Sequence, residues 1–299
     1  MYLLTRLIRF RLSAMVAASA LAGYLLCPRD GYAAGAAALT LGIFFLTGAC
    51  SALNQVQERA TDALMERTAS RPIPAGRLSP RAGLAAAGLL LVAALLLLQT
   101  TRSLPALALG LFAVAWYNGL YTPLKKITSA AILPGALCGA LPPVIGWAAA
   151  GGSVTDHRIA VLAGVFFLWQ IPHFWLLAIR RSEDYRRAGL PTVAQTFTAA
   201  QTARITLVWI VALAVGTFLL AAVGPLRQPL PRALCALAAA SVLWPAVGRC
   251  LGRGPGPSEL CLSARPGRFM ALLVFALLLE GLLTDYRPFL VSLTGIPIG

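Results

Sequence analysis

The chain is poor in charged residues, and acidic residues are the scarcest of them. Only 12% of the 299 residues are charged, and Asp and Glu together number 10. A soluble domain carries about 25% charged residues, whereas 59% of this chain is hydrophobic. The composition excludes an ordinary soluble globular protein and indicates a membrane protein.

The chain also lacks a cysteine framework and a processing site. Its six cysteines form no CxxC pair and lie mostly in or beside apolar runs. Such cysteines usually pack as small apolar residues, so we assign them neither a metal nor a disulfide. Cys27-Pro28-Arg29 is not a small-residue cleavage site, and the first apolar run is therefore expected to remain as an anchor.

Long apolar runs are abundant. A membrane-spanning helix needs about 20 mostly apolar residues. The sequence predicts nine such spans, at residues 11–27, 33–53, 82–101, 104–121, 129–150, 159–179, 204–224, 231–248 and 268–284. The predicted fold class is all-α: one membrane-embedded domain over residues 1–299, with about nine transmembrane helices in the lipid bilayer.

The net charge of +15 raises the question of a nucleic-acid partner. With the N-terminus inside, 19 of the 25 Lys and Arg fall in inner segments and 6 in outer ones. Because this bias follows the positive-inside rule, topology explains most of the charge and we expect no nucleic acid. The prediction is a multi-pass protein of the cell inner membrane, with its N-terminus and charged loops on the cytoplasmic side. That basic face would attract anionic substrates or lipid headgroups.

Two long inner loops, residues 54–81 and 180–204, concentrate the acidic side chains. They hold half of all Asp and Glu in the chain, namely Glu58, Asp62, Glu66, Glu183 and Asp184. The loops lie four spans apart, which predicts two similar halves that face a common cavity.

The first loop carries the strongest chemical signal. Asn54, Glu58 and Asp62 are spaced by four residues and would share one helix face. Carboxylates about one turn apart can hold a hard cation such as Mg²⁺, which in turn binds phosphate oxygens. Arg67 and Arg71 follow at the same spacing and could hold a phosphate directly. The alternative is a solvated, salt-bridged helix end, which would not need an Arg-Thr-x-x-Arg-Pro-x-Pro run at the membrane end of a span.

The fifth span contains an unusual number of proline and glycine residues. It includes Pro134, Gly135, Gly139, Pro142, Pro143 and Gly146. Two interpretations remain open: a kink where helices approach closely, or a broken helix that lines a substrate chamber.

The first block, Asn54-x-x-x-Glu58-x-x-x-Asp62-x-x-Met65-x-Arg67-Thr68-x-x-Arg71-Pro72, resembles the first signature of the UbiA superfamily of intramembrane prenyltransferases. Four further stretches resemble the heme-farnesylating branch of that superfamily: 121–128, 135–147, 167–174 and 184–191. The sequence departs from the wider pattern twice. Glu58 stands where Asp is usual, and only Asp184 clearly matches the second motif's usual pair of aspartates.

The resemblance implies a UbiA-like bundle around a central cavity and a Mg²⁺-dependent transfer of farnesyl from farnesyl diphosphate to a vinyl group of heme b, giving heme O. It implies that Asn54, Glu58, Asp62 and Asp184 are catalytic and bind the metal. The substrate-binding residues that it implies are Arg67, Arg71, Tyr121, Lys125, Lys126, Trp169, Gln170, His173, Arg181 and Tyr185. A heme A synthase is the protein partner that it suggests.

Several alternatives stay open at this stage. His173 either contacts the heme, with iron as one possible ligand, or is simply hydrogen-bonded within a span. Lys125 and Lys126 either contact diphosphate or heme propionates, or are ordinary topology charges. A UbiA-type enzyme for an aromatic acid or quinone precursor is the nearest rival function. A membrane transporter is the rival from another class, but it would need polar residues distributed along the spans.

Overall fold

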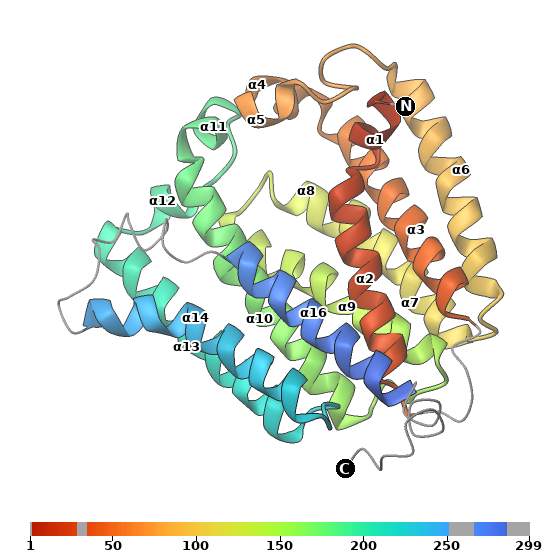
Figure 1. The fold of residues 1–299 in the computed structure, drawn as a ribbon. Helices are drawn as coiled ribbons and strands as arrows, with labels where there is room; N and C mark the ends of the chain where they lie inside the picture. The colour runs from red at the N-terminus through yellow and green to blue at the C-terminus, as the bar shows by residue number, and fades with distance from the viewer. Residues whose placement is uncertain (1, 29–34, 251–265, 286–299) are drawn as a thin grey trace.

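The computed structural model describes residues 2–28, 35–250 and 266–285, and these residues form helices but no strand (Figure 1). The long helices are α2 (Phe10–Leu26), α3 (Ala36–Gln57), α6 (Pro80–Gln99), α7 (Leu104–Val114), α9 (Ile132–Ala149), α10 (His157–Arg180), α13 (Ala199–Val223), α14 (Pro229–Cys250) and α16 (Pro266–Asp285). The short ones are α1 (Tyr2–Leu7), α4 (Arg59–Leu64), α5 (Glu66–Ala69), α8 (Thr122–Leu124), α11 (Ser182–Arg187) and α12 (Val193–Thr196).

The prediction of an all-α membrane bundle is confirmed. Seven helical segments of the described chain are long and apolar enough to cross a bilayer, and Phe10–Leu26 and Pro229–Trp244 are shorter apolar helices. The fourth span runs from Leu104 to Leu124 because α7 continues through a π-helical turn into α8. The last expected span corresponds to α16, which has 20 residues.

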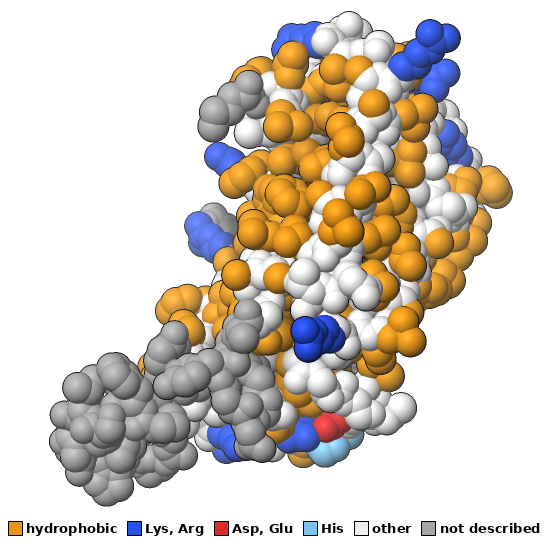
Figure 2. Space-filling view, turned by 90° about the vertical axis from the view of Figure 1, so that its right-hand side faces the viewer, with side chains coloured by type: hydrophobic (Ala, Val, Ile, Leu, Met, Phe, Trp, Pro, Cys, Tyr) orange, Lys and Arg blue, Asp and Glu red, His pale blue; other side chains and the backbone are white. Residues whose placement is uncertain are grey.

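Large apolar side chains cover the outside of the bundle. Figure 2 shows the face over α6 and α7, where hydrophobic side chains fill the middle and Lys and Arg lie toward the ends and along the left edge. Leu89 of α6 is 75% exposed and Leu104 of α7 is 76% exposed. Such a surface is stable only in contact with lipid, so the chain is a multi-pass membrane protein.

α2 and α9 cross closely at the centre of the bundle. Gly23 of α2 lies against the carbonyl of Pro143, and Gly146 of α9 lies against the carbonyl of Ala20. A side chain at either glycine would collide with the facing backbone. α9 stays helical from Ile132 to Ala149 through Pro142 and Pro143, so the helix is not broken. It packs closely against α2, and its Gly135, Gly139 and Pro142 also line a cavity, so each of the two interpretations holds in part.

The two acidic loops lie at the same end of the bundle, together with α1 (Figure 1). We call this the motif end and define it by α1, α4, α5 and α11. Met65, Ala188 and Leu190 form a small buried cluster that joins the first loop to the second. The two acidic loops therefore face the same region of the bundle, as expected.

The opposite end holds structural polar contacts. Glu280, which we expect near the interface and outside any catalytic role, is buried and accepts hydrogen bonds from the backbone N–H groups of Arg227 and Gln228 at 2.8 and 3.0 Å. It thus ties α16 to the start of α14. Residues 251–265, with Cys261, and the side chain of Cys250 lie outside what the structure describes, and Cys50, Cys138 and Cys235 are free thiols.

Gly23→Ala is a direct test of the α2–α9 crossing. The added methyl group would meet the Pro143 carbonyl, and overpacking of this kind costs about 1–3 kcal/mol. We expect a lower apparent Tm of the detergent-solubilised protein. Gly88→Ala is the matched control, because Gly88 lies on α6 with open space around it. Equal Tm values for the two variants would show that the crossing is looser than described.

Candidate active site

A cavity of about 370 Å³ lies at the motif end between α2, α3, α9 and α10. Its size is within the range of small-molecule sites. The end of α3 contributes Asn54 and Glu58, whereas Ile43 and Leu46 line it about two to three turns deeper. The cavity is therefore charged near the motif end and apolar toward the middle of the bundle.

The first motif keeps the stacking that its spacing predicts. α3 ends at Gln57, yet the Glu58 N–H donates to the Asn54 carbonyl at 2.9 Å and the Asp62 N–H donates to the Glu58 carbonyl at 2.8 Å. These bonds carry the helical path across the junction into α4. Asn54, Glu58 and Asp62 therefore stay on one side, and all three line the cavity.

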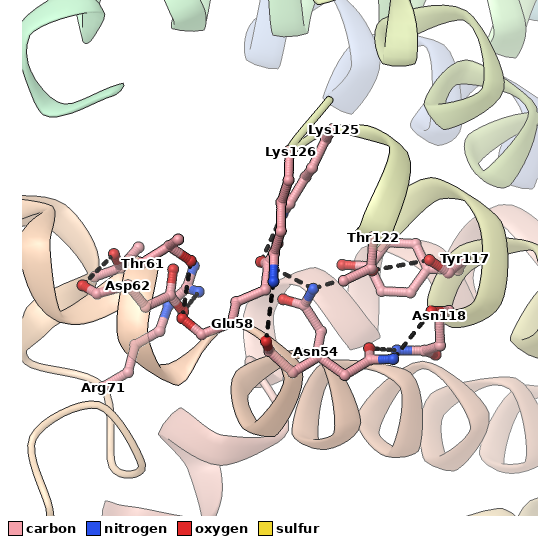
Figure 3. Close-up of polar contacts among 12 residues, drawn as sticks. Asn54, Glu58, Thr61, Asp62, Arg71, Tyr117, Asn118, Thr122, Lys125 and Lys126 are labelled. Carbon is pink, nitrogen blue, oxygen red and sulfur yellow. Dashed lines mark hydrogen bonds and ion pairs between the residues drawn. The ribbon is translucent and has the colours of Figure 1, made fainter. Parts of the chain in front are cut away.

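Both carboxylates of this ladder are buried and paired with cations (Figure 3). Glu58 is 3% exposed, and its Oε2 accepts hydrogen bonds from Lys125 Nζ at 2.6 Å and from Asn54 Nδ2 at 3.0 Å. Asp62 is 1% exposed, and its Oδ2 accepts from Arg71 at 2.5 Å. Buried carboxylates need such partners because an unpaired buried charge is very costly.

The chain reverses direction between Asp62 and Arg71, and this reversal allows the second ion pair to form. Met65 has an extended backbone, and the Thr68 hydroxyl donates to the Asp62 carbonyl at 2.9 Å. The Arg71 N–H then donates to the Thr68 carbonyl at 2.9 Å. The helix does not continue to Arg71; a hydrogen-bonded loop returns Arg71 to the ladder instead.

The π-helical turn over Ala115–Tyr121 sets the opposite wall. Its Asn118 is buried and donates through Nδ2 to the Cys50 carbonyl and to Gln57 Oε1, which ties the turn to α3 (Figure 3). Tyr117 and Tyr121 line the cavity with ring centroids 5.6 Å apart. π-helical turns are frequent at functional sites because they re-aim side chains.

Lys125 follows this turn after α8 and lies between the Tyr121 ring and the Glu58 carboxylate. Its Nζ is 5.6 Å from the centroid of the Tyr121 ring as well as hydrogen-bonded to Glu58. Burial lowers the pKa of Lys125, and the Glu58 carboxylate opposes that effect only in part. The ammonium is thus held mainly by Glu58 and would gain from a further anion.

The second motif reaches the first through Asp184. Its Oδ1 accepts a hydrogen bond from the Glu66 N–H at 3.3 Å, and its buried Oδ2 has no hydrogen-bond partner among the described residues. Tyr185, next to it, lines the cavity, and burial raises the pKa of this phenol. A buried carboxylate oxygen without a partner is suited to a cation, since it otherwise carries a desolvation cost.

The donor set suits a hard cation by its chemistry. Asn54, Glu58, Asp62 and Asp184 supply only oxygen ligands of the kind that Mg²⁺ prefers. In the arrangement described, Lys125 and Arg71 pair with two of these carboxylates, and no three His, Cys, Asp or Glu of the described residues form a metal cluster. A metal held by all three carboxylates would require them to move closer together than they lie in this arrangement.

Deeper in the cavity, α10 presents an aromatic pair. The Trp169 and His173 rings stack at 4.5 Å with planes 16° apart. Gln170 lies against Gly139 of α9, and the Tyr121 ring lies against Gly135. A side chain at either glycine would displace these groups, so α9 shapes this part of the cavity by having none there.

The structure places most of the predicted site residues together. Those that line the cavity are Asn54, Glu58, Asp62, Arg67, Arg71, Tyr121, Lys125, Trp169, Gln170, His173 and Tyr185. Asp184 is buried but is not one of the residues that line the cavity. Lys126 and Arg181 are exposed and do not line it, and Lys126 Nζ instead donates to the Gln57 carbonyl at 3.2 Å.

The cavity residues that the sequence analysis did not single out include Arg9, Cys50, Tyr117 and Cys138. Tyr117 precedes Tyr121 by one turn, and that spacing could have revealed it. Arg9 could not be found in this way, because it is one of several arginines near the N-terminus that topology alone explains.

Comparison with known proteins gives consistent matches. A family model described as the UbiA prenyltransferase family matches residues 16–273. The chain is 43% identical over 274 residues to a protoheme IX farnesyltransferase of Geobacter sulfurreducens, covering 92% of this chain and 97% of that protein. It is 44% identical to a protein of the same name from Nitratidesulfovibrio vulgaris, over 72% of this chain and 75% of the relative.

Solved structures share the fold at low sequence identity. A digeranylgeranylglyceryl phosphate synthase structure superposes with a TM-score of 0.73 at 14% identity, covering 94% of this chain and 98% of the other. A UbiA homolog from Archaeoglobus fulgidus bound to GPP and Mg²⁺ gives 0.68 at 15% identity, covering 93% and 99%.

Lys125→Met tests the ion pair with Glu58. The substitution leaves a buried carboxylate with only Asn54 as a partner, and because Lys125 is partly exposed we expect a loss of about 1–3 kcal/mol. Thermal unfolding of the ligand-free protein measures it. The double variant Lys125→Met/Glu58→Gln should recover most of the loss.

Lys126→Met is the matched control, since Lys126 is the exposed neighbour with a single backbone contact. If Lys125→Met unfolds at the same temperature as Lys126→Met, the Glu58 pair does not stabilise the fold.

Proposed function

The chain belongs to the UbiA prenyltransferase family, and from this premise we propose that it transfers a farnesyl group from farnesyl diphosphate to a vinyl group of heme b. The product would be heme O. The relatives that share 43% and 44% identity with it carry the name protoheme IX farnesyltransferase. Family membership makes it a prenyltransferase and removes the transporter interpretation.

One observation supports the proposal most: a single cavity joins an acidic and basic end to an apolar and aromatic interior. A prenyl diphosphate has the same division, with an anionic head and an apolar tail. We assign the head to the end with Asn54, Glu58 and Asp62. The tail then extends among the apolar side chains of α2, α3 and α9.

Mg²⁺ bound by Asn54, Glu58, Asp62 and Asp184 would neutralise charge on the leaving diphosphate. The related structure bound to GPP and Mg²⁺ is in keeping with a metal-dependent prenyl transfer. Glu58 is suitable in place of Asp because it keeps the carboxylate and adds one methylene group. The buried Asp184 Oδ2, which has no partner among the described residues, is an available ligand atom.

The protein's own cations complete the diphosphate site. Arg67 and Arg71 would bind phosphate oxygens, and Lys125 would exchange Glu58 for the diphosphate. In this account the two ion pairs of the ligand-free cavity are temporary contacts. They keep the carboxylates and cations neutralised until the substrate and metal bring the opposite charges.

The reaction then needs orientation and exclusion of water more than acid–base chemistry. The bond between the allylic carbon and the diphosphate oxygen breaks, and a carbon–carbon bond forms to the heme vinyl group. A water supplies the hydroxyl that quenches the resulting cation, and its proton leaves with the diphosphate. The Tyr121 ring, which lies near Lys125, would face the allylic cation.

We assign the acceptor to the stacked pair on α10. Trp169 and His173 present flat faces in the cavity, and Gln170 lies beside them against Gly139. Such a surface suits a planar macrocycle. His173 is proposed to contact the heme, and Tyr185 to close the motif end of the cavity. Lys126 and Arg181, being exposed outside the cavity, would act at the stage where anionic substrates approach.

We further propose that the chain acts as one domain in the cell inner membrane. Its motif end would face the cytoplasm, in keeping with the basic residues counted in the inner segments. A heme A synthase that consumes the product remains the proposed partner.

The deciding experiment incubates purified protein with heme b, farnesyl diphosphate and Mg²⁺ and analyses the products by mass. We expect a farnesylated, hydroxylated heme, loss of that product on chelation, and its return when Mg²⁺ is restored. Prenylation of 4-hydroxybenzoate without any farnesylated heme would replace this proposal with the aromatic-acid alternative.

Asp62→Ala is the sharpest test of the metal and diphosphate site. It removes a ladder carboxylate, and we expect turnover to fall by about 100-fold or more while the protein remains folded in the membrane. Glu66→Ala is the matched control, because Glu66 is an exposed carboxylate of the same loop and should stay within about twofold of the parent. Turnover of Asp62→Ala close to that of Glu66→Ala would remove Asp62 from the site.

A further inference from the structure

Arg9 has a backbone conformation that an arginine rarely adopts. It separates α1 from α2 with φ 51° and ψ 56°, in the left-handed region that favours glycine. Residues held in this region concentrate where the surroundings over-determine them, often at functional sites. Neighbouring contacts must therefore hold Arg9 in this conformation.

Buried side chains hold the turn on both sides of Arg9. Gln55, fully buried in α3, donates to the Leu7 carbonyl at 2.8 Å and to the Arg6 carbonyl at 3.3 Å. Ser13, also fully buried, donates to the Ile8 carbonyl at 2.7 Å. The backbone before Arg9 is therefore fixed by contacts that do not involve the arginine side chain.

As a result, the face of α2 that lines the cavity changes from charged to apolar along the helix. Arg9, Leu12 and Val16 all line it, and they follow one another at helical spacing. A charge lies at the motif end of this face and apolar side chains lie deeper. The same polarity occurs on the α3 side, where the ladder carboxylates lie at the motif end of the cavity and Leu46 and Ile43 lie deeper.

The charges of the cavity distinguish Arg9 from its neighbours. Lys125 and Arg71 are each paired with a carboxylate. Arg9 and Arg67 also line the cavity, yet neither forms an ion pair or hydrogen bond through its side chain to any residue that the structure describes. Two cations that lack a partner in one cavity imply ligands with more than one anionic group.

From this arrangement we infer that Arg9 binds an oxyanion of a substrate, on the α2 side of the cavity and separate from the ladder of Asn54, Glu58 and Asp62. This inference deepens the proposed function and rests on it. Both proposed substrates carry oxyanions: the carboxylates of heme b and the diphosphate of farnesyl diphosphate. The chemistry is the same, and the experiment separates the two sources.

The test uses Arg9→Gly, because glycine adopts the left-handed conformation without strain while the substitution removes the side chain with its guanidinium. KM is measured separately for heme b and for farnesyl diphosphate, and heme b affinity is also measured by absorption titration without the second substrate. We expect one of the two KM values to rise by about tenfold or more. A rise for heme b, with weaker titration, identifies the carboxylate, and a rise for farnesyl diphosphate identifies the diphosphate.

Two further variants keep the inference falsifiable. Arg9→Lys retains a cation at the same backbone position and should recover most of the lost affinity. Arg11→Ala removes an exposed arginine of α2 that does not line the cavity, and it should leave both KM values within about twofold of the parent.

Unchanged KM values and unchanged heme titration in a folded Arg9→Gly protein would overturn the inference, and so would equal losses in Arg9→Gly and Arg11→Ala. Either outcome leaves the proposed function intact, because the parent protein's product decides that question. If the parent prenylates another acceptor instead, the same KM comparison is made with that acceptor.

Discussion

The structure depends on keeping carboxylates charged inside an apolar bundle. Glu58 and Asp62 are almost fully buried at the end of α3, and either one would be strongly destabilising without a cation. Lys125 and Arg71 meet this need from two different directions. The loop after Asp62 reverses in order to return Arg71, and the π-helical turn before Lys125 brings that lysine over the ladder. Two local irregularities of the backbone thus follow from one electrostatic requirement.

The same requirement organises the cavity. Because the charges gather at the motif end, the remaining wall can be apolar and aromatic. α9 has no side chain at Gly135 and Gly139, which leaves room for Tyr121 and Gln170. On its other face, Gly146 lets α2 approach. One helix thereby serves both packing and cavity shape, which explains why its glycines and prolines allowed two interpretations in the sequence.

The sequence was sufficient wherever a signal is local and periodic. Apolar length located the spans, and a four-residue spacing placed Asn54, Glu58 and Asp62 on one face. It was insufficient where the partner is distant. Nothing in the spacing of Lys125 and Lys126 shows that the first pairs with Glu58 while the second points outward to Gln57. That difference arises from the π-helical turn, which tertiary contacts of Asn118 hold. Likewise, a left-handed arginine leaves no trace in composition.

Charge balance links this architecture to catalysis. In the proposed function, a diphosphate and a divalent cation would enter a cavity whose carboxylates are already paired, and the existing ion pairs would exchange partners. Such an exchange would keep Glu58 and Asp62 paired throughout, which lowers the cost of binding relative to a site that must first desolvate bare ions. It would also leave Arg9 and Arg67 as cavity cations that form no ion pair with a described carboxylate. A second anionic substrate would meet this remaining positive charge, so one cavity can serve two amphipathic anions without a second set of carboxylates.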